Sequence, residues 1–380
     1  MELETLKQQM DDLDSRMSEL FARRMELSAD LAKARKEQGL VPMDLAGQRE
    51  ARARFQQTAG EALAGYAGVV YATLQDVSQS YQASLLREPS DLCARIAKSL
   101  ETTRQLFPES ATVACQGVEG AYSQIAADKL FADAHISYVR SFEAVFSAIA
   151  NGFCQYGVLP LENSTAGSVN RIYDLMMEYN FSIVRSVRVK VDHNLMVRPG
   201  VKREDIKEIF SHEQAIAQCA AFLKSMPGVK VTVCENTAMA AKRVAESDRR
   251  DIAALSSHAC GALYGLDTLA ADVQDKGNNY TRFICIGKEP EIFPGADRTS
   301  VMLTLSHRPG ALYRVMSRIT ALGINLTKLE SRPLPDRDFE FMFYFDLETS
   351  VYSPRFIQLL GDLEEMCETF RYLGSYSEIV

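Results

Sequence analysis

The sequence predicts a multidomain chain that runs from an all-α segment through an α/β region to a small α+β segment. The first 36 residues contain no Gly or Pro, and their apolar residues recur every three or four positions, which is typical of a long packed helix. From residue 111 short apolar runs alternate with helical stretches, a pattern that favours a layered α/β sheet. After residue 299 the order is strand, helix, strand, strand and helix, which predicts a ferredoxin-like unit. The predicted layout is 1–90 helical, 91–110 linker, 111–287 α/β, 288–298 linker and 299–380 α+β.

Composition and charge narrow the class of protein. The chain has 380 residues and a formal net charge of −8, from 42 Lys and Arg against 50 Asp and Glu. It lacks the basic surplus that suits a nucleic-acid partner, and no apolar run approaches the ~18 residues of a membrane span. The cysteines and histidines are dispersed without a CxxC pair, so neither a metal nor a cofactor is expected. The opening Met-Glu-Leu-Glu lacks the pattern of a secretory signal, which favours a cytoplasmic enzyme or regulator.

One basic residue interrupts the apolar seam of the first helix. Arg24 falls where an apolar residue belongs, and a guanidinium at a helix interface is costly unless it meets an anion. Arg35 projects from the same face about 16 Å away, whereas Lys7 lies roughly 25 Å from Arg24 and could join a shared site only from a second chain. The alternative is a plain coiled coil in which Arg24 extends to water. The seam consists of Leu3, Leu6, Met10, Leu13, Met17, Leu20, Leu27, Leu31 and Ala34.

Two further helices are expected to pack against the first. A loop with Gly39, Pro42 and Gly47 precedes helical residues 48–55, and residues 69–87 form a third segment without Gly or Pro. Helices with basic and polar residues at these places resemble the all-α chorismate mutase family. The matching residues are Lys7, Arg24, Arg35, Arg49, Glu50, Ser78 and Gln82.

This resemblance implies a chorismate-mutase-like helical domain in which two chains intertwine and chorismate rearranges to prephenate. That rearrangement needs no nucleophile, only groups that fold the substrate and stabilise charge growing on its ether oxygen. In this interpretation Arg24, Arg49 and Lys7 of a second chain hold carboxylates, while Arg35 and Gln82 face the ether oxygen.

The second helix admits two alignments. Arg49-Glu50 matches the family's Arg-Glu pair if the preceding loop carries a two-residue insertion, which we prefer because insertions belong in loops. An ungapped alignment instead places Gly47-Gln48 there and leaves the site incomplete.

Short apolar strands in the central region end in polar clusters. Ligands of α/β sheets bind where strands end, although turn chemistry alone could also explain each cluster. Strands are expected at 112–115, 156–159, 183–187, 192–197 and 251–255. The clusters are Gln116 to Ser123, Pro160 to Gly167 and Asn278 to Phe283.

Together these clusters resemble the prephenate dehydratase family, whose pattern includes a Gly-rich opening, Pro-x-Glu-Asn-Ser/Thr-x-x-Gly, Ser-His-Pro-Gln and Thr-Arg-Phe. The resemblance implies a two-lobed α/β domain, similar to a periplasmic binding protein, that holds prephenate in its cleft. The matching stretches are Gly117 to Ser123, Pro160 to Gly167, Ser211 to Gln214 and Thr281 to Phe283. The binding residues implied are Ser123, Glu162, Asn163, Ser164, Thr165, Gly167, His212, Gln214, Thr237, Arg282 and Phe283.

The family assigns the catalytic donor role to the Thr of Thr-Arg-Phe, here Thr281. Prephenate loses CO₂ and its ring hydroxyl together, so the enzyme must help hydroxide leave. Because an alcohol is a weak acid, we interpret Thr281 as an oriented hydrogen-bond donor in a dry cleft. His212 or Glu162 could supply the proton itself, and a structural role for either is an equal alternative.

The C-terminal segment resembles an ACT domain, an amino-acid-sensing module with a ferredoxin-like α+β fold. Gly310-Ala311-Leu312 and Glu330-Ser331-Arg332-Pro333 match the two signatures of the dehydratase type. The resemblance implies a phenylalanine site between paired domains and feedback inhibition. Its residues would be Gly310, Ala311, Leu312, Asn325, Glu330, Ser331, Arg332 and Pro333.

The sequence therefore favours a bifunctional enzyme that takes chorismate through prephenate to phenylpyruvate under inhibition by phenylalanine, as a homodimer or tetramer. One alternative is a prephenate or arogenate dehydratase whose residues 1–87 are a degenerate dimerisation bundle. Another is a non-catalytic sensor of aromatic amino acids.

Overall fold

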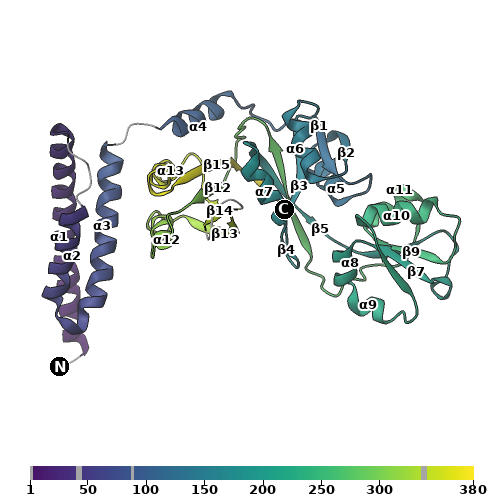
Figure 1. The fold of residues 1–380 in the computed structure, drawn as a ribbon, viewed down its shortest axis with the longest axis horizontal. Helices are drawn as coiled ribbons and strands as arrows, with labels where there is room; N and C mark the ends of the chain where they lie inside the picture. The colour runs from purple at the N-terminus through teal and green to yellow at the C-terminus, as the bar shows by residue number, and fades with distance from the viewer. Residues whose placement is uncertain (1–2, 40–44, 87–89, 335–339) are drawn as a thin grey trace. The chain divides into compact units, whose positions relative to one another are not determined.

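The structure, a computed structural model, describes residues 3–39, 45–86, 90–334 and 340–380. The chain forms two compact units, a helical unit and an α/β unit, whose helices and strands are labelled in Figure 1. The segment 299–380, predicted as one domain, contributes its helices to the first unit and its strands to the second. The helical unit comprises Met1–Ala94, Ser306–Gly323 and Pro354–Cys367, and the α/β unit comprises Arg95–Leu305, Ile324–Ser353 and Glu368–Val380.

The helical unit confirms the long N-terminal helix and shifts the start of the third one. The third segment was predicted from residue 69, whereas α3 already begins at Ala64. A Cβ at Gly68 would lie 2.5 Å from the side-chain nitrogen of Gln56, so the glycine lets α2 approach α3 closely. The elements are α1 Leu3–Glu37, α2 Leu45–Ala59, η1 Glu61–Leu63, α3 Ala64–Leu86, α12 Ala311–Ala321 and α13 Pro354–Met366, and α4 Asp91–Thr102 leads into the α/β unit.

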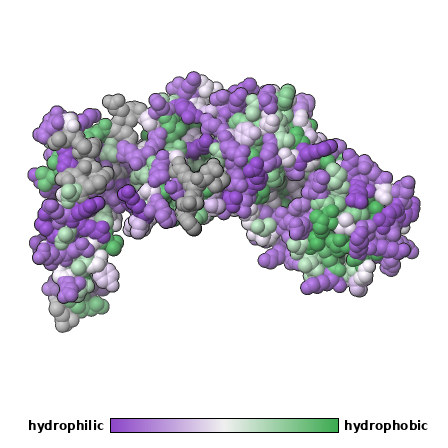
Figure 2. All heavy atoms as spheres, viewed as in Figure 1, coloured by the Kyte–Doolittle hydropathy of each residue, from purple (hydrophilic) through white to green (hydrophobic). Residues whose placement is uncertain are grey.

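The apolar seam of α1 has little cover within the chain. The buried residues of α1 are Ala29 and Ala32, which lie outside the seam, whereas the seam residue Leu3 is 69% exposed and Met17 is 63% exposed. Figure 2 shows hydrophobic residues interspersed among hydrophilic ones on the viewed face of α1–α3. No helix within the described ranges is long and apolar enough to cross a membrane.

The first lobe of the α/β unit is a mixed sheet with the order β16-β5-β11-β3-β1-β2, and β4 pairs with β3. Its central strands are apolar runs with both faces covered, and Val113, Val158 and Ile284 are fully buried. Strand β1 runs parallel to β2 and β3, whereas β11 runs antiparallel to β3 and β5. The strands are β1 Ser110–Gln116, β2 Asp133–Val139, β3 Tyr156–Asn163, β4 Gly167–Ser168, β5 Ser182–Lys190, β11 Tyr280–Gly287 and β16 Glu378–Ile379. The helices are α5 Tyr122–Leu130, α6 Phe142–Ala150 and α7 Asn170–Glu178.

The second lobe has its own sheet, with the order β10-β6-β9-β7-β8, and its own core. The chain enters this lobe after β5 and returns to the first lobe at β11. Its strands are β6 Asn194–Val197, β7 Glu208–Ser211, β8 Lys230–Val233, β9 Ile252–Ser256 and β10 Asp267–Ala270. Its helices are η2 Arg203–Asp205, α8 Glu213–Gln218, α9 Ala220–Lys224, α10 Thr237–Glu246 and α11 His258–Tyr264.

A third sheet, called the C-terminal sheet, packs against the first lobe. Tyr173 of α7 meets Tyr344 edge to face, with ring centroids 4.9 Å apart in a shared core. At Gly374, with φ 137°, a Cβ would lie 2.2 Å from the Ile183 carbonyl oxygen, so only glycine allows β15 this close to β5. The sheet has the order β13-β14-β12-β15, and β15 was absent from the sequence prediction. Its strands are β12 Arg298–Thr304, β13 Asn325–Pro333, β14 Phe341–Glu348 and β15 Thr369–Tyr376.

Candidate active site

A cavity of about 490 Å³ lies between the two lobes of the α/β unit, where strands β1, β3 and β7 end. Predicted residues that line it include Thr281, the predicted donor of the Thr-Arg-Phe motif, and Asn163 across the sheet. The predicted lining residues are Ser123, Asn163, Gly167, His212, Gln214, Thr237, Thr281 and Phe283.

Asn163 and Thr281 form the hydrogen-bonded centre of this cavity. They face each other in the register of β3 and β11. The Asn163 side-chain oxygen accepts from the backbone N–H groups of Thr165 and Ala166, at 3.0 and 2.9 Å. Backbone amides can only donate, so the Asn163 nitrogen must face Thr281, where it donates to Oγ1 at 2.9 Å. The Thr281 oxygen is therefore an acceptor in this bond, and its own proton remains available for another partner.

A second layer of amides holds Asn163 in place. Asn279 accepts from the Asn163 nitrogen at 2.8 Å and donates to Gln218 at 3.0 Å. Gln218 in turn donates to the Thr165 hydroxyl at 2.6 Å. Since the Gln218 oxygen already accepts from Asn279, the His193 Nε2 that lies 2.8 Å from it must carry a proton. These contacts fix which atom donates in each hydrogen bond around Asn163. They leave the Thr281 oxygen as the acceptor of a bond from Asn163.

Both imidazoles that line the cavity are neutral at neutral pH. Burial lowers the pKa of His193, against a smaller opposing effect of its bond to Gln218. Burial also lowers the pKa of His212, whose Nδ1 accepts from the backbone N–H of Gln214 at 3.3 Å as the first residue before α8. Neither side chain is poised as a protonated acid.

Glu162 is also unsuited to supply a proton. Burial alone would raise its pKa, but the hydrogen bond and charge of Lys328, together with Arg282, hold the pKa below its ordinary value. Its carboxylate is therefore ionised, and it points away from the cavity.

The cavity carries little formal charge. Among the described residues that line it, Glu235 is the only Asp, Glu, Lys or Arg. Anions would instead meet neutral donors and the N-termini of α5 and α10, where Asn236 caps α10 by accepting from Met239 at 2.7 Å.

Four of the predicted dehydratase-site residues do not line the cavity. Ser164 and Thr165 shape the turn after β3, where Ser164 accepts from the Tyr280 backbone at 2.9 Å. Glu162 and Arg282 lie on the opposite face of β3 and β11, because neighbouring residues of a strand point to opposite faces.

Several site residues were missed by sequence reasoning, although some had a signal. Gln218 follows Gln214 by one helical turn, and Asn279 stands two positions before Thr281. His193 had been assigned to a strand, but β6 begins only at Asn194. Further lining residues are Gln116, Tyr122, Phe142, Ser168, Val191 and Asn236.

Comparison with known proteins agrees with this geometry. The family model for prephenate dehydratase matches residues 113–291. Arogenate dehydratase 2 of Petunia hybrida is 39% identical over 281 residues, which cover 70% of this chain and 71% of that protein. The chain belongs to the prephenate dehydratase family.

Other similarities extend over different parts of the chain. A bifunctional chorismate mutase/prephenate dehydratase of Pseudomonas aeruginosa is 29% identical over 384 residues, covering 100% of this chain and 98% of that protein. The solved prephenate dehydratase of Arthrobacter aurescens in complex with L-Phe has a TM-score of 0.65 and 28% identity, over 70% of this chain and 90% of that chain. A solved chain described as GqqA, a quorum quenching acylase, has a TM-score of 0.63 and 30% identity, over 70% and 96%. Members of this fold therefore differ in their described activities.

The helical unit brings together part of the predicted mutase site. Arg24 on α1 donates to the Ser78 hydroxyl on α3, and its guanidinium lies 5.7 Å from the ring centroid of Tyr71. One turn further along, Gln82 donates to the Ser28 carbonyl oxygen at 3.0 Å. The interrupting Arg24 of the seam thus faces α3 and does not extend to water.

The other predicted mutase residues lie elsewhere. Lys7 is exposed beside Glu4, at 3.9 Å. Arg49 and Glu50 are exposed, whereas Gln48 accepts from Gln79 at 3.2 Å and faces α3. The phase of α2 explains this, since positions 48, 52 and 56 share one helix face. Arg35 is half-buried on α1. Of the loop predicted to carry the insertion, Gly47 lies in α2, and residues 40–44 fall outside the described residues.

The predicted phenylalanine-site residues divide between the two units. Gly310, with φ 84°, precedes α12 in the helical unit, followed by Ala311 and Leu312. In the α/β unit, Glu330 of β13 accepts from Ser168 at 2.5 Å and Arg332 forms a two-point ion pair with Asp174. The remaining members on β13 are Asn325, which donates to Glu348 at 2.8 Å, Ser331 and Pro333.

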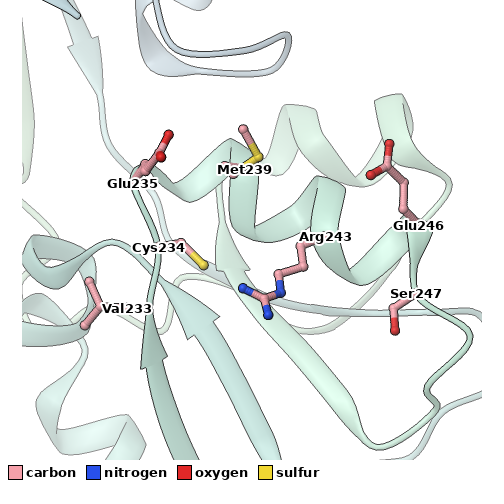
Figure 3. A pocket seen from close by; sticks show the side chains of 7 residues that line it. All are labelled: Val233, Cys234, Glu235, Met239, Arg243, Glu246 and Ser247. Carbon is pink, nitrogen blue, oxygen red and sulfur yellow. The ribbon is translucent and has the colours of Figure 1, made fainter. Parts of the chain in front are cut away.

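A second hollow, of about 570 Å³, opens beside α10 in the second lobe (Figure 3). Arg243 points under the helix toward Cys234, and its guanidinium lies 4.4 Å from the Phe210 ring centroid. Glu235 and Glu246 also line this open hollow, so it presents charges of both signs and no single ligand chemistry.

Proposed function

We propose that the chain converts prephenate to phenylpyruvate, CO₂ and water in the interlobe cavity. The observation that carries this proposal is the orientation of the Asn163–Thr281 pair, in which Asn163 donates to Thr281 and frees the Thr281 proton. A hydroxyl held in this way can donate to an oxygen that gains negative charge as it leaves.

The reaction balances without any further reactant. The bond between the ring and its hydroxyl breaks with its electron pair on oxygen, toward which Thr281 donates. The ring carboxylate leaves as CO₂, and the electron pair of its carbon–carbon bond enters the ring, which becomes aromatic. A proton drawn ultimately from solvent turns the departing hydroxide into water, and Thr281 stabilises the charge until it arrives.

The low charge of the cavity supports this chemistry. The carboxylate that leaves as CO₂ loses its negative charge in the transition state, so a cation beside it would stabilise the substrate more than the transition state. Neutral donors such as Ser123 and Thr237 can orient the substrate without that cost.

We further propose that the helical unit rearranges chorismate to prephenate as a dimer. Arg24 and Gln82, held by Ser78 and Ser28, would bind the substrate between α1 and α3. The exposed apolar seam of α1 would be covered by a second copy of the chain, which would also deliver its Lys7. The match of the Pseudomonas aeruginosa bifunctional protein over the full chain supports this function.

The C-terminal sheet with α12 and α13 would form an ACT domain that binds phenylalanine and inhibits dehydration. The chain order of strand, helix, strand, strand, helix and strand supports this fold. The two motifs that begin at Gly310 and Glu330 support the ligand.

A turnover assay with the full chain tests these functions together. Chorismate should yield prephenate and then phenylpyruvate, and added phenylalanine should lower the second rate and raise the thermal midpoint. Prephenate that is bound but releases no CO₂ would point to the sensor and overturn the proposed dehydration. Prephenate and arogenate should be compared in the same assay.

One observation favours a narrower function, dehydration without mutase activity. Gln48 faces α3 while Arg49 and Glu50 are exposed, which is the incomplete arrangement of the ungapped alignment. If the chain forms phenylpyruvate from prephenate but not from chorismate, this narrower function is established. An acylase would need an activated nucleophile, but among the described cavity residues no hydroxyl group is hydrogen-bonded to His193 or His212.

A further inference from the structure

The opposite face of the catalytic strands carries a buried ionic cluster. On β11, Thr281 faces the cavity while Arg282 faces the C-terminal sheet. On β3, Asn163 faces the cavity while Glu162 faces the same way as Arg282. The register pairs Arg282 with Glu162 and Thr281 with Asn163, so the two pairs are neighbours back to back.

Arg282 is tied to two strands of the C-terminal sheet. It is 8% exposed, and it forms an ion pair with the buried Asp346 of β14. It also donates to the Tyr376 hydroxyl of β15 at 2.6 Å. Asp346 accepts in addition from Ser300 at 2.5 Å, so the aspartate itself is held in one orientation.

Glu162 is tied to a third strand of the same sheet. Its Oε1 lies 3.2 Å from an Arg282 nitrogen, and its Oε2 lies 2.5 Å from Nζ of Lys328 on β13. Lys328 also donates at 3.0 Å to Ser168, which lines the cavity. These contacts define the anchor cluster, which consists of Glu162, Arg282, Lys328, Asp346 and Tyr376.

No member of the anchor cluster is among the described residues that line the cavity, so these side chains do not touch substrate there. A buried ion pair costs desolvation of both charges and adds little net stability, but loss of one partner leaves an uncompensated buried charge. The remaining charge would then move toward water and take its strand with it. The strand segments in question carry Asn163 and Thr281.

We propose that Arg282 and Glu162 are positioning residues, through which the C-terminal sheet fixes the geometry of the Asn163–Thr281 pair. This inference rests on the proposed dehydration and deepens it. The sheet that carries the phenylalanine motif is thereby connected to the reacting groups by side chains that bind no substrate.

The test compares two ways of weakening the anchor with a matched tether elsewhere. Asp346→Asn removes one of the three carboxylates that pair with Arg282, the other two being Glu162 and Glu378. Tyr376→Phe removes one hydroxyl while keeping the packed ring. The control is Asp174→Asn, which breaks the Arg332 ion pair between the C-terminal sheet and α7 but changes no residue of the anchor cluster.

Each full-length variant is assayed with prephenate, and its thermal midpoint is recorded. Asp346→Asn should lower kcat about tenfold and Tyr376→Phe about threefold, with KM changed by less than about threefold, because the groups that bind substrate remain. Asp346→Glu should recover most of the rate, and Asp174→Asn should stay within about twofold of the wild type.

Failure of this inference is distinguishable from failure of the proposed function. If the wild-type chain does not convert prephenate, the function itself is overturned. If it does, a Tyr376→Phe variant with an unchanged kcat overturns the positioning role, as does a raised KM at constant kcat. An Asp174→Asn variant as slow as Asp346→Asn would show a general need for sheet docking and would also overturn it.

Discussion

The interlobe cavity and the helical bundle differ in how many of their predicted site residues one chain brings together. In the cavity, Asn163 is fixed by two backbone amides and in turn fixes Thr281, so the reacting geometry is built by a single chain. In the bundle, Arg24 and Gln82 are held against α3, but Lys7 is exposed and the seam of α1 is uncovered. Under the proposed functions, the cavity site is held by backbone and side-chain hydrogen bonds within one chain, whereas the bundle site would need a second chain.

The substitution with the largest expected effect reverses the direction of the hydrogen bond between Asn163 and Thr281. Asn163→Asp has the same shape but only accepts, so Thr281 would donate to it and not to substrate. We expect kcat for prephenate to fall at least about 10²-fold. The matched control is Asn278→Asp, at an exposed position of the Asn278 to Phe283 cluster that contains Thr281, which should keep the wild-type rate. Equal rates for both variants would contradict the role of the pair.

The second largest effect is a loss of activity that is confined to the helical unit. Arg24→Ala should lower chorismate turnover about 10²-fold, because its guanidinium is the cation held between α1 and α3. Prephenate turnover should not change. Arg23→Ala, at an exposed neighbour paired with Glu26, is the control and should leave both rates intact. A loss of both activities in Arg24→Ala would mean that the bundle supports the fold of the whole chain.

A mixing experiment tests whether the bundle site draws on two chains. Lys7→Ala and Arg24→Ala chains should each lack mutase activity, yet a heterodimer contains one site with both residues. After unfolding and refolding together, the mixture should regain about a quarter of wild-type chorismate turnover, since half of the dimers are mixed and half of their sites are intact. No recovery would contradict a site shared between chains.

The smallest effect concerns pH. Burial holds the pKa of His193 and His212 below the ordinary value of about 6.5, so both stay neutral above it. Below that pH the histidines of the unfolded chain bind protons more readily than those of the folded chain. The free energy of unfolding therefore falls as the pH falls. Prephenate turnover should vary less than about twofold from pH 8 to 6.5 and decline below. A rate that rises as the pH falls through 6.5 would instead identify His212 as a protonated acid.

The sequence predicted some elements of the fold and missed others, for physical reasons. Buried strands such as β3 and β11 stand out because both of their faces are apolar, whereas β15, Thr369–Tyr376, mixes polar and aromatic residues and was missed. Gly65 and Gly68 precede the predicted third segment, 69–87, yet both lie within α3, which begins at Ala64.

At the site, motifs identified the strands but not the faces of their residues. Arg282 and Glu162 were assigned to the substrate with their neighbours Thr281 and Asn163, yet the two-residue period of a strand already places neighbours on opposite faces. Asn279 and Gln218 act through contacts between distant segments, which no local pattern reveals. Gln48 faces α3 because of the rotational orientation of α2 about its own axis. The sequence alone does not determine that orientation.

The donor role of the Thr281 hydroxyl is tested most directly by two substitutions at that one position. Thr281→Val keeps the shape of the side chain without its hydroxyl, and Thr281→Ser keeps the hydroxyl. With prephenate as substrate, the account predicts a fall in kcat of at least about 10²-fold for valine and less than about tenfold for serine, with similar KM values. A valine variant that forms phenylpyruvate at the wild-type rate would contradict it.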